Sequence, residues 1–191
     1  DLVMFYNYRL TFELNRMVNI YENDIKLLNR RFVSPIGTNA ISFYKFYIMD
    51  TVRVEQDSCI HLSFVPQNIQ DFGFTGHLYV LNDSSYAVKK CTMNLPQRTG
   101  VNFVDNMDIE QEFIQLDNGS WVLKNDIMTV DLSLVDFIQG VQIERTTKYS
   151  NYDFTAIEDK LFNPKAQMIR ERNARNRDED YWTEVRQVPL S

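Results

Sequence analysis

Three side chains of types that bind metals fall close together between Cys59 and His77. If Ile60 pairs with Leu78 across a hairpin, His61 lies directly opposite His77, at about 5 Å. Cys59 would share that face, because alternate residues of a strand point the same way. Zinc takes nitrogen and sulfur ligands of this kind, yet two sheet histidines beside a small buried thiol are the commoner arrangement. We therefore expect no metal site and no cofactor.

Motifs for catalysis are weak throughout the sequence. Ser63 has no G-x-S-x-G elbow around it, and the six glycines are too scattered to form a phosphate-binding loop. Both cysteines lie inside expected strands rather than at helix starts, which would favour a thiolate. With 26 carboxylates, a pair that resembles a glycosidase arises by chance. Glu110 and Glu112 share a strand face, and Asp105 and Asp108 are expected to flank a turn. We expect a solvated sheet face and no catalytic residues.

Gly76 lies within an expected strand, where glycine marks either a bulge or a close approach of another group to the backbone. A bulge is the default interpretation, and a ligand groove is the more specific alternative. Six aromatic side chains are candidates to line such a groove, although sets of this kind more often form a core. They are Phe43, Phe46, Phe64, Phe74, Tyr79 and Phe113.

The stretch from Ile60 to Val80 predicts a β-hairpin, in which Pro66 closes the first strand and Gly73 opens the second. Strands over 59–65, 74–82 and 85–93 would form a meander that places one strand between Cys59 and Cys91. Two strand spacings are about 9.6 Å. A disulfide needs Cα atoms within roughly 7 Å. We expect both cysteines to be unpaired.

The rest of the chain alternates in the same way. Residues 41–54 are apolar on both faces, which predicts a strand that is central or covered on both sides. Asn118-Gly119 predicts a type I′ turn. Asn163-Pro164 predicts the start of a charged helix over 165–180, followed by an extended tail from Tyr181-Trp182. Further strands are expected over 6–14, 107–116, 128–134 and 141–149, while 18–28 suits either a strand or a short helix.

Length and charge narrow the class of protein. The 191 residues suffice for one domain with a core, and the aromatic content of 13% is typical of packed sheets. A net charge of −6 argues against nucleic acid as a partner. No run approaches the roughly 20 apolar residues of a membrane-spanning helix. We expect a mainly β (α+β) fold: a curved antiparallel sheet or half-open barrel in meander order, with a charged C-terminal helix.

The expected domain organisation has three parts. Residues 1–16 form an N-terminal strand that belongs either to this domain or to a preceding module. Residues 17–154 form the antiparallel β domain, and 155–191 form a helix and linker. The chain starts within strand-like sequence, which predicts a fragment of a larger protein.

An ordered series of motifs resembles a family of uncharacterised Bacteroidetes-type outer-membrane proteins. The motifs are VNIYENDIKLLNRRFVSPI, FYKFYIMDT, IHLSFVPQN, FGFTGHLYV, SWVL after the Asn-Gly turn, and YWTEVRQVPLS. In that family a carboxypeptidase-regulatory-like β-sandwich precedes such a region and a membrane β-barrel follows it. The resemblance implies a non-enzymatic domain at the periplasmic face of the outer membrane. Its partners would be other envelope proteins or the protein's own barrel, towards which residues 181–191 would lead.

A second resemblance is to periplasmic lipoprotein carriers, whose half-open sheet binds lipid. It rests on Phe64-Val65-Pro66 and Phe74-Thr75-Gly76, and fold analogy does not carry function. The functions to separate are interaction or positioning, binding of a lipid or other hydrophobic ligand, and hydrolysis of envelope glycans or lipids. A filled core favours the first, a wide apolar cavity the second, and converging carboxylates or a Cys/His pair the third. Arg170, Arg172, Arg175 and Arg177 would meet lipid phosphates if their helix lies near the membrane.

Overall fold

A computed structural model describes residues 18–27, 30–68, 70–96, 104–133, 140–156 and 176–185. The chain divides into two compact units, Asp1–Thr147 and Lys148–Ser191. The first unit holds every described strand except for Lys148, the last residue of β9. The predicted strand over 6–14 and most of the predicted helix over 165–180, with its start at Asn163-Pro164, lie outside the described residues.

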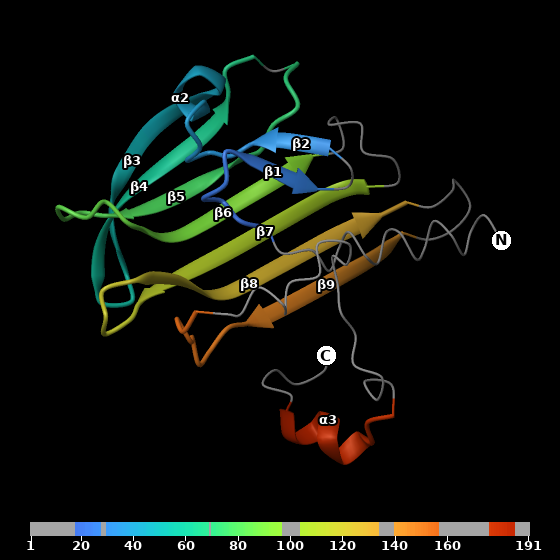
Figure 1. Cartoon of the computed structure of the whole chain (residues 1–191). Helices are drawn as coiled ribbons and strands as arrows, with labels where there is room; N and C mark the ends of the chain where they lie inside the picture. Colours follow the sequence, from blue (N-terminus) through green and yellow to red (C-terminus); the bar gives the residue numbers. More distant parts are fainter. Residues whose placement is uncertain are drawn as a thin grey trace. The chain divides into compact units, whose positions relative to one another are not determined.

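The main feature of the first unit is an open antiparallel sheet of seven strands, whose spatial order is the chain order (Figure 1). This confirms the predicted mainly β fold and its meander connectivity. The strands are β3 (Tyr44–Val54), β4 (Asp57–Pro66), β5 (Thr75–Leu81), β6 (Val88–Pro96), β7 (Val104–Gln115), β8 (Trp121–Leu132) and β9 (Val141–Lys148).

The hairpin of β4 and β5 follows the predicted plan, since β4 ends at Pro66 and β5 begins just after Gly73. Its predicted register was wrong by two residues. Ile60 pairs with Val80 rather than Leu78, so His61 lies opposite Tyr79, and His77 lies opposite Ser63. A slip of two residues keeps every side chain on its own face, so the alternation pattern has no power to detect it.

One face of the sheet is covered by a small hairpin of β1 (Asp24–Leu27) and β2 (Arg30–Val33). Figure 1 shows these two blue strands lying across the larger sheet. For residues 18–28 the sequence left a strand and a short helix as alternatives, and the structure has a strand at Asp24–Leu27. Phe32 packs against Phe74 with ring centroids 5.2 Å apart. The core between the layers is filled by fully buried side chains, including Ile20, Ile25, Leu27, Phe64, Phe74, Met93, Leu95, Met107, Ile109 and Met128.

Tyr44 joins the two layers at one end of the core. Its side chain is 1% exposed, and its hydroxyl donates a hydrogen bond to the carbonyl of Val33 at 2.7 Å. The same hydroxyl oxygen accepts a bond from the backbone N–H of Phe74 at 3.3 Å. Burial raises the pKa of Tyr44 well above its ordinary value. The phenol is thus a neutral link between β2, β3 and the start of β5.

A buried polar cluster joins the sheet to the covering layer further along. The Gln111 side-chain amide donates to the backbone carbonyl of Val18 at 2.8 Å and to the Asp126 carboxylate at 2.9 Å. Asp126 is fully buried and also accepts a hydrogen bond from Arg145 on β9. Buried charges need such partners because unpaired ones are costly. This cluster therefore stabilises the packing of residue 18 against the far half of the sheet.

The strand over 41–54 was expected to be central or covered on both sides, and both alternatives were wrong. Among the described strands β3 pairs only with β4, so it is an edge strand. Residues 40–43 form one helical turn, α2 (Ala40–Phe43), before the strand begins. A register shift between Ile48 and Asp50 leaves Met49 without a partner in β4. Apolar side chains on both faces therefore indicate surface exposure here, not burial.

Two smaller predictions also need correction. Asp105 and Asp108 do not flank a turn, because both lie within β7. Tyr181 and Trp182 do not begin an extended tail, because they belong to α3 (Glu179–Val185), the described helix of the second unit. Its first turn carries Glu179 and Asp180, whose negative charges stabilise a helix N-terminus. A further correction concerns the turn at 117–120, which lies where it was predicted but is not type I′. That type has a positive φ at both central residues, whereas Gly119 has a φ of 83° and Asn118 is not among the residues with positive φ.

Candidate functional site

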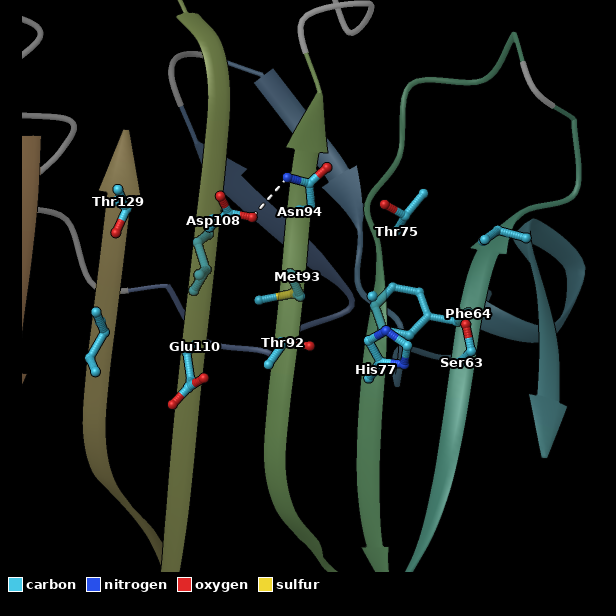
Figure 2. Close-up of a pocket in the computed structure, with 14 residues that line it drawn as sticks. Ser63, Phe64, Thr75, His77, Thr92, Met93, Asn94, Asp108, Glu110 and Thr129 are labelled. Carbon is cyan, nitrogen blue, oxygen red and sulfur yellow. Dashed lines mark hydrogen bonds between the residues drawn. The ribbon is translucent and has the colours of Figure 1, made fainter. Parts of the chain in front are cut away.

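The face of the sheet opposite β1 and β2 carries a groove of about 570 Å³ that spans β4 to β8 (Figure 2). Two cross-strand rows of side chains line it. In the first row, Ser63, His77, Thr92 and Glu110 are successive partners in the ladder. In the second row, Thr75, Asn94, Asp108 and Thr129 follow one another in the same way. Figure 2 shows these side chains on the face turned away from the blue strands.

Small side chains form the floor of this groove. Serine and threonine occupy four of the eight row positions, and Gly76 lies between the rows on β5. A Cβ built on Gly76 would lie 1.9 Å from the carbonyl oxygen of Thr92. The register through Gly76 is continuous, and the irregularity between β5 and β6 lies at Tyr79/Val80 instead. Gly76 therefore marks a close approach of two backbones rather than a bulge, and it lies within a groove.

The groove retains unused hydrogen-bonding capacity. The hydroxyls of Ser63, Thr75, Thr92 and Thr129 make no hydrogen bond to any residue that the structure describes. Each hydroxyl donates one bond and accepts up to two. All four residues are half-buried, so water or a ligand satisfies them. A concave surface with several free hydroxyls is equipped to bind a polar molecule.

Its carboxylates, in contrast, have protein partners. Glu110 accepts an ion pair from Lys90 at 2.8 Å. Asp108 accepts hydrogen bonds from the amides of Asn94 at 2.8 Å and Asn106 at 2.6 Å. The dashed line in Figure 2 marks the bond from Asn94. Both groups are therefore oriented acceptors. The predicted shared face of Glu110 and Glu112 is confirmed, since Lys90 also lies 3.8 Å from Glu112.

His77, one of the lining residues, forms a pair with His61 on β4. His61 Nε2 and His77 Nδ1 are 3.0 Å apart, and His61 Nδ1 lies 3.0 Å from a carboxylate oxygen of Asp50. His61 also stacks on Tyr79 with centroids 4.7 Å apart. If both rings are neutral, Nδ1–H of His61 donates to Asp50 and Nδ1–H of His77 donates to His61. This assignment leaves a lone pair on Nε2 of His77, which bonds to no described residue.

Desolvation favours that neutral form of His77. Burial is the larger cause that lowers its pKa below the ordinary value, and the neighbouring His61 lowers it further. Protonation of His77 would place a positive charge in a half-buried position next to the His61 ring. At neutral pH His77 is therefore an uncharged acceptor at the groove.

The zinc patch considered from the sequence is not formed. The two imidazoles do meet, but diagonally, because the register differs from the predicted one. Cys59 is fully buried, and the described residues contain no group of three or more His, Cys, Asp or Glu able to hold a metal ion. Burial raises the pKa of both thiols. Cys59 and Cys91 are free, as predicted, with β5 between their strands.

The six aromatic candidates belong mainly to the core. Phe64, Phe74 and Phe113 are buried in it, and Phe43 and Phe46 pack against it. Tyr79 lies on the polar face through its stack with His61. The sequence reasoning missed the threonines and Asn94 of the groove. Their signal was available, since Lys90, Thr92 and Asn94 alternate with buried residues along β6.

Comparison with known proteins identifies a family. The sequence profile of a family of unknown function, DUF5686, matches residues 6–152. The chain belongs to this family. No curated protein and no solved structure gives a significant match. Within the described part of this DUF5686 chain, no helix has the length and apolar character needed to cross a membrane.

Proposed function

We propose that this DUF5686 chain is a non-enzymatic domain of an outer-membrane protein that binds or positions a protein partner at the periplasmic face. The observation that carries the proposal is the apolar edge, three consecutive exposed side chains on β3: Tyr47, Ile48 and Met49. Their exposed fractions are 51%, 78% and 57%. Apolar residues adjacent on an edge strand mark an interaction site more strongly than scattered ones do.

The geometry of this edge suits an extended segment of another protein. On the side away from β4, no described strand pairs with β3, and that side of the strand is where the proposal places a new strand. Strand addition takes affinity from main-chain hydrogen bonds and specificity from side chains. The unpaired Met49 sits at the centre of the eleven-residue strand. The expected occupant is a strand from another envelope protein, with the protein's own barrel as the alternative source.

The filled core supports this function over a lipid carrier. A carrier needs a wide apolar cavity, yet the apolar face of the sheet is packed against β1, β2 and the residues before them. The groove on the other face is not an enclosed apolar cavity, since eight of its fourteen lining residues have polar side chains. Its two carboxylates have structural partners, which supports binding over hydrolysis. The periplasmic location is supported by the resemblance of the sequence motifs to outer-membrane proteins.

Site-specific photo-crosslinking in cells tests the apolar edge. A photoreactive amino acid at Ile48 is expected to crosslink to one defined peptide of an envelope protein or of the protein's own barrel. The same amino acid at Asn118, in the exposed β7–β8 turn, is the matched control. Introducing Met49→Lys should abolish the Ile48 crosslink without changing the melting temperature. Identical crosslinked peptides from Ile48 and Asn118 would disprove the edge as a docking site.

Two further measurements test the other parts of the proposal. Separation of inner and outer membranes, with protease added before and after the outer membrane is opened, tests the location. Mass spectrometry of an organic extract beside native mass spectrometry tests the carrier alternative. One lipid retained per chain would overturn the assignment in favour of lipid binding.

A further inference from the structure

We propose that the groove on the face opposite β1 and β2 is a binding site for a short oligosaccharide of neutral or amino sugars. This site is separate from the apolar edge, and the proposal does not depend on the function proposed for that edge. The groove lies over β4 to β8 and has a volume of about 570 Å³. That volume falls within the range of roughly 300–1,000 Å³ typical of small-molecule sites.

The length of the groove suits a chain rather than a single small ion. Four strand spacings separate β4 from β8, which amounts to about 19 Å at roughly 4.8 Å each. The two rows of side chains run along this direction, because they follow the ladder from strand to strand. Figure 2 shows the row from Ser63 through His77 and Thr92 to Glu110 crossing the strands. An extended polymer bound along the groove would therefore make repeated contacts with the two rows of side chains.

The chemistry of the rows matches the hydroxyls of sugars. A sugar hydroxyl both donates and accepts, so it pairs with groups of either kind. The four free hydroxyls of the groove offer both, and Asp108 and Glu110 offer oriented acceptors. Bonds to ionised acceptors are roughly twice as strong as neutral ones. The lone pair on Nε2 of His77 adds a further acceptor near Ser63.

Charge decides which sugars fit. Two carboxylates line the groove, while the nearby Lys90 is already engaged by Glu110 at 2.8 Å. An acidic sugar would bring a like charge towards Asp108 and Glu110, which costs free energy in a partly desolvated site. A neutral or amine-bearing sugar avoids this cost. The polar members of the lining also disfavour a lipid, since their hydroxyl and carboxylate groups would lose water without gaining partners, although apolar side chains such as Val65 and Ile127 line the groove as well.

Isothermal titration calorimetry of the 191-residue chain with chitotetraose, the tetramer of N-acetylglucosamine, tests the site. We expect saturable binding. The double variant Thr92→Val and Thr129→Val keeps the shape of the floor and removes two hydroxyls. Its affinity should fall roughly tenfold, the loss expected for two hydrogen bonds of ordinary net strength. Thr51→Val on β3, outside the groove residues, is the matched control and should bind like the unchanged chain.

A second arm tests the role of charge. The glucosamine tetramer, which carries amines, should bind at least as tightly as chitotetraose, and the galacturonate tetramer should bind more weakly. Asp108→Asn should narrow the difference between these two ligands, because it removes one of the repelling charges without changing shape. This variant also keeps the proposal testable if the double valine variant does not fold.

The outcomes that overturn the proposal are specific. Absence of binding by both the neutral and the amine tetramer would disprove an oligosaccharide site. Equal affinity of the unchanged chain and the folded double variant would place any binding outside the groove. Tighter binding of galacturonate than of glucosamine would disprove the assigned charge preference. None of these results bears on the apolar edge, whose test uses Ile48 and Met49.

Discussion

The two faces of the seven-stranded sheet are built from the same strands and have opposite chemistry. Along β7, Met107, Ile109 and Phe113 are buried against the covering layer, while Asp108, Glu110 and Glu112 point to the groove side. The covered face excludes water and holds the fold together. The groove face keeps polar groups that contribute little to packing. Substitutions at neighbouring residues of one strand should therefore differ sharply in how much they lower the free energy of unfolding.

Adjacent residues on β4 provide the largest expected contrast. Phe64→Ala empties space in the core, and the free energy of unfolding should fall by roughly 3–5 kcal/mol. Ser63→Ala, one position away on the groove face, should change it by about 0.5 kcal/mol or less. Urea denaturation of both variants measures the difference. Similar losses for both would mean that the groove face is as structurally critical as the core.

Two aspartates, one on each face of the sheet, test the same contrast for charged side chains. Asp126→Asn removes the charge of a fully buried carboxylate that accepts bonds from both Gln111 and Arg145, and should cost about 3 kcal/mol or more because it breaks a buried charge pair. Asp108→Asn removes an exposed carboxylate and should cost within about 1 kcal/mol. The measurement is the free energy of unfolding at pH 7. A larger cost at Asp108 than at Asp126 would contradict the assignment of the two faces.

Gly76 tests how closely the strands approach beneath the groove. Gly76→Ala places a methyl group against the Thr92 carbonyl and should destabilise the fold by roughly 1–3 kcal/mol through strand displacement. Gly140→Ala is the control, since its Cβ would lie 3.4 Å from the nearest atom, a carbonyl oxygen of Leu132. Thermal melting compares them. A Gly76→Ala melting temperature no lower than that of Gly140→Ala would exclude the close approach.

The smallest expected effect is the pH response of the histidine pair. Because the pKa of His77 is lowered in the folded chain, the unfolded chain binds protons more readily below the ordinary value of 6.5. The contribution of His77 is therefore fully present above that pH and is lost as the pH falls through the lower, folded-state value. His77→Gln should flatten the loss of stability between neutral pH and pH 5.5. An unchanged slope would mean that other groups cause it.

Much of the architecture was predictable from local patterns. The alternation in β4 to β8, the Pro66 and Gly73 boundaries and the position of the Asn118-Gly119 turn each depend on neighbouring residues. The structure confirms these features, although the turn is not of the predicted type I′. The unpaired cysteines followed from strand order alone. These features were accessible because the side-chain period and the turn chemistry are properties of short segments.

The candidate site was predictable only in part. Gly76 pointed to it, but the choice between bulge and groove needed the register with β6. The histidines were correctly placed on one face, yet their partners were wrong, because the loop of residues 67–74 sets the register and a slip of two leaves the pattern unchanged. Ser63 therefore became the neighbour of His77 only in the structure.

By itself, the sequence determined which side chains share a face, where the strands turn and which groups are charged, since these depend on residue type and local period. The tertiary structure decided which face is covered, that β3 lies at an edge, and which hydroxyls and carboxylates meet across β4 to β8. Those outcomes depend on contacts between residues far apart in the chain. Their free energies are set by packing and pairing, which no short segment encodes.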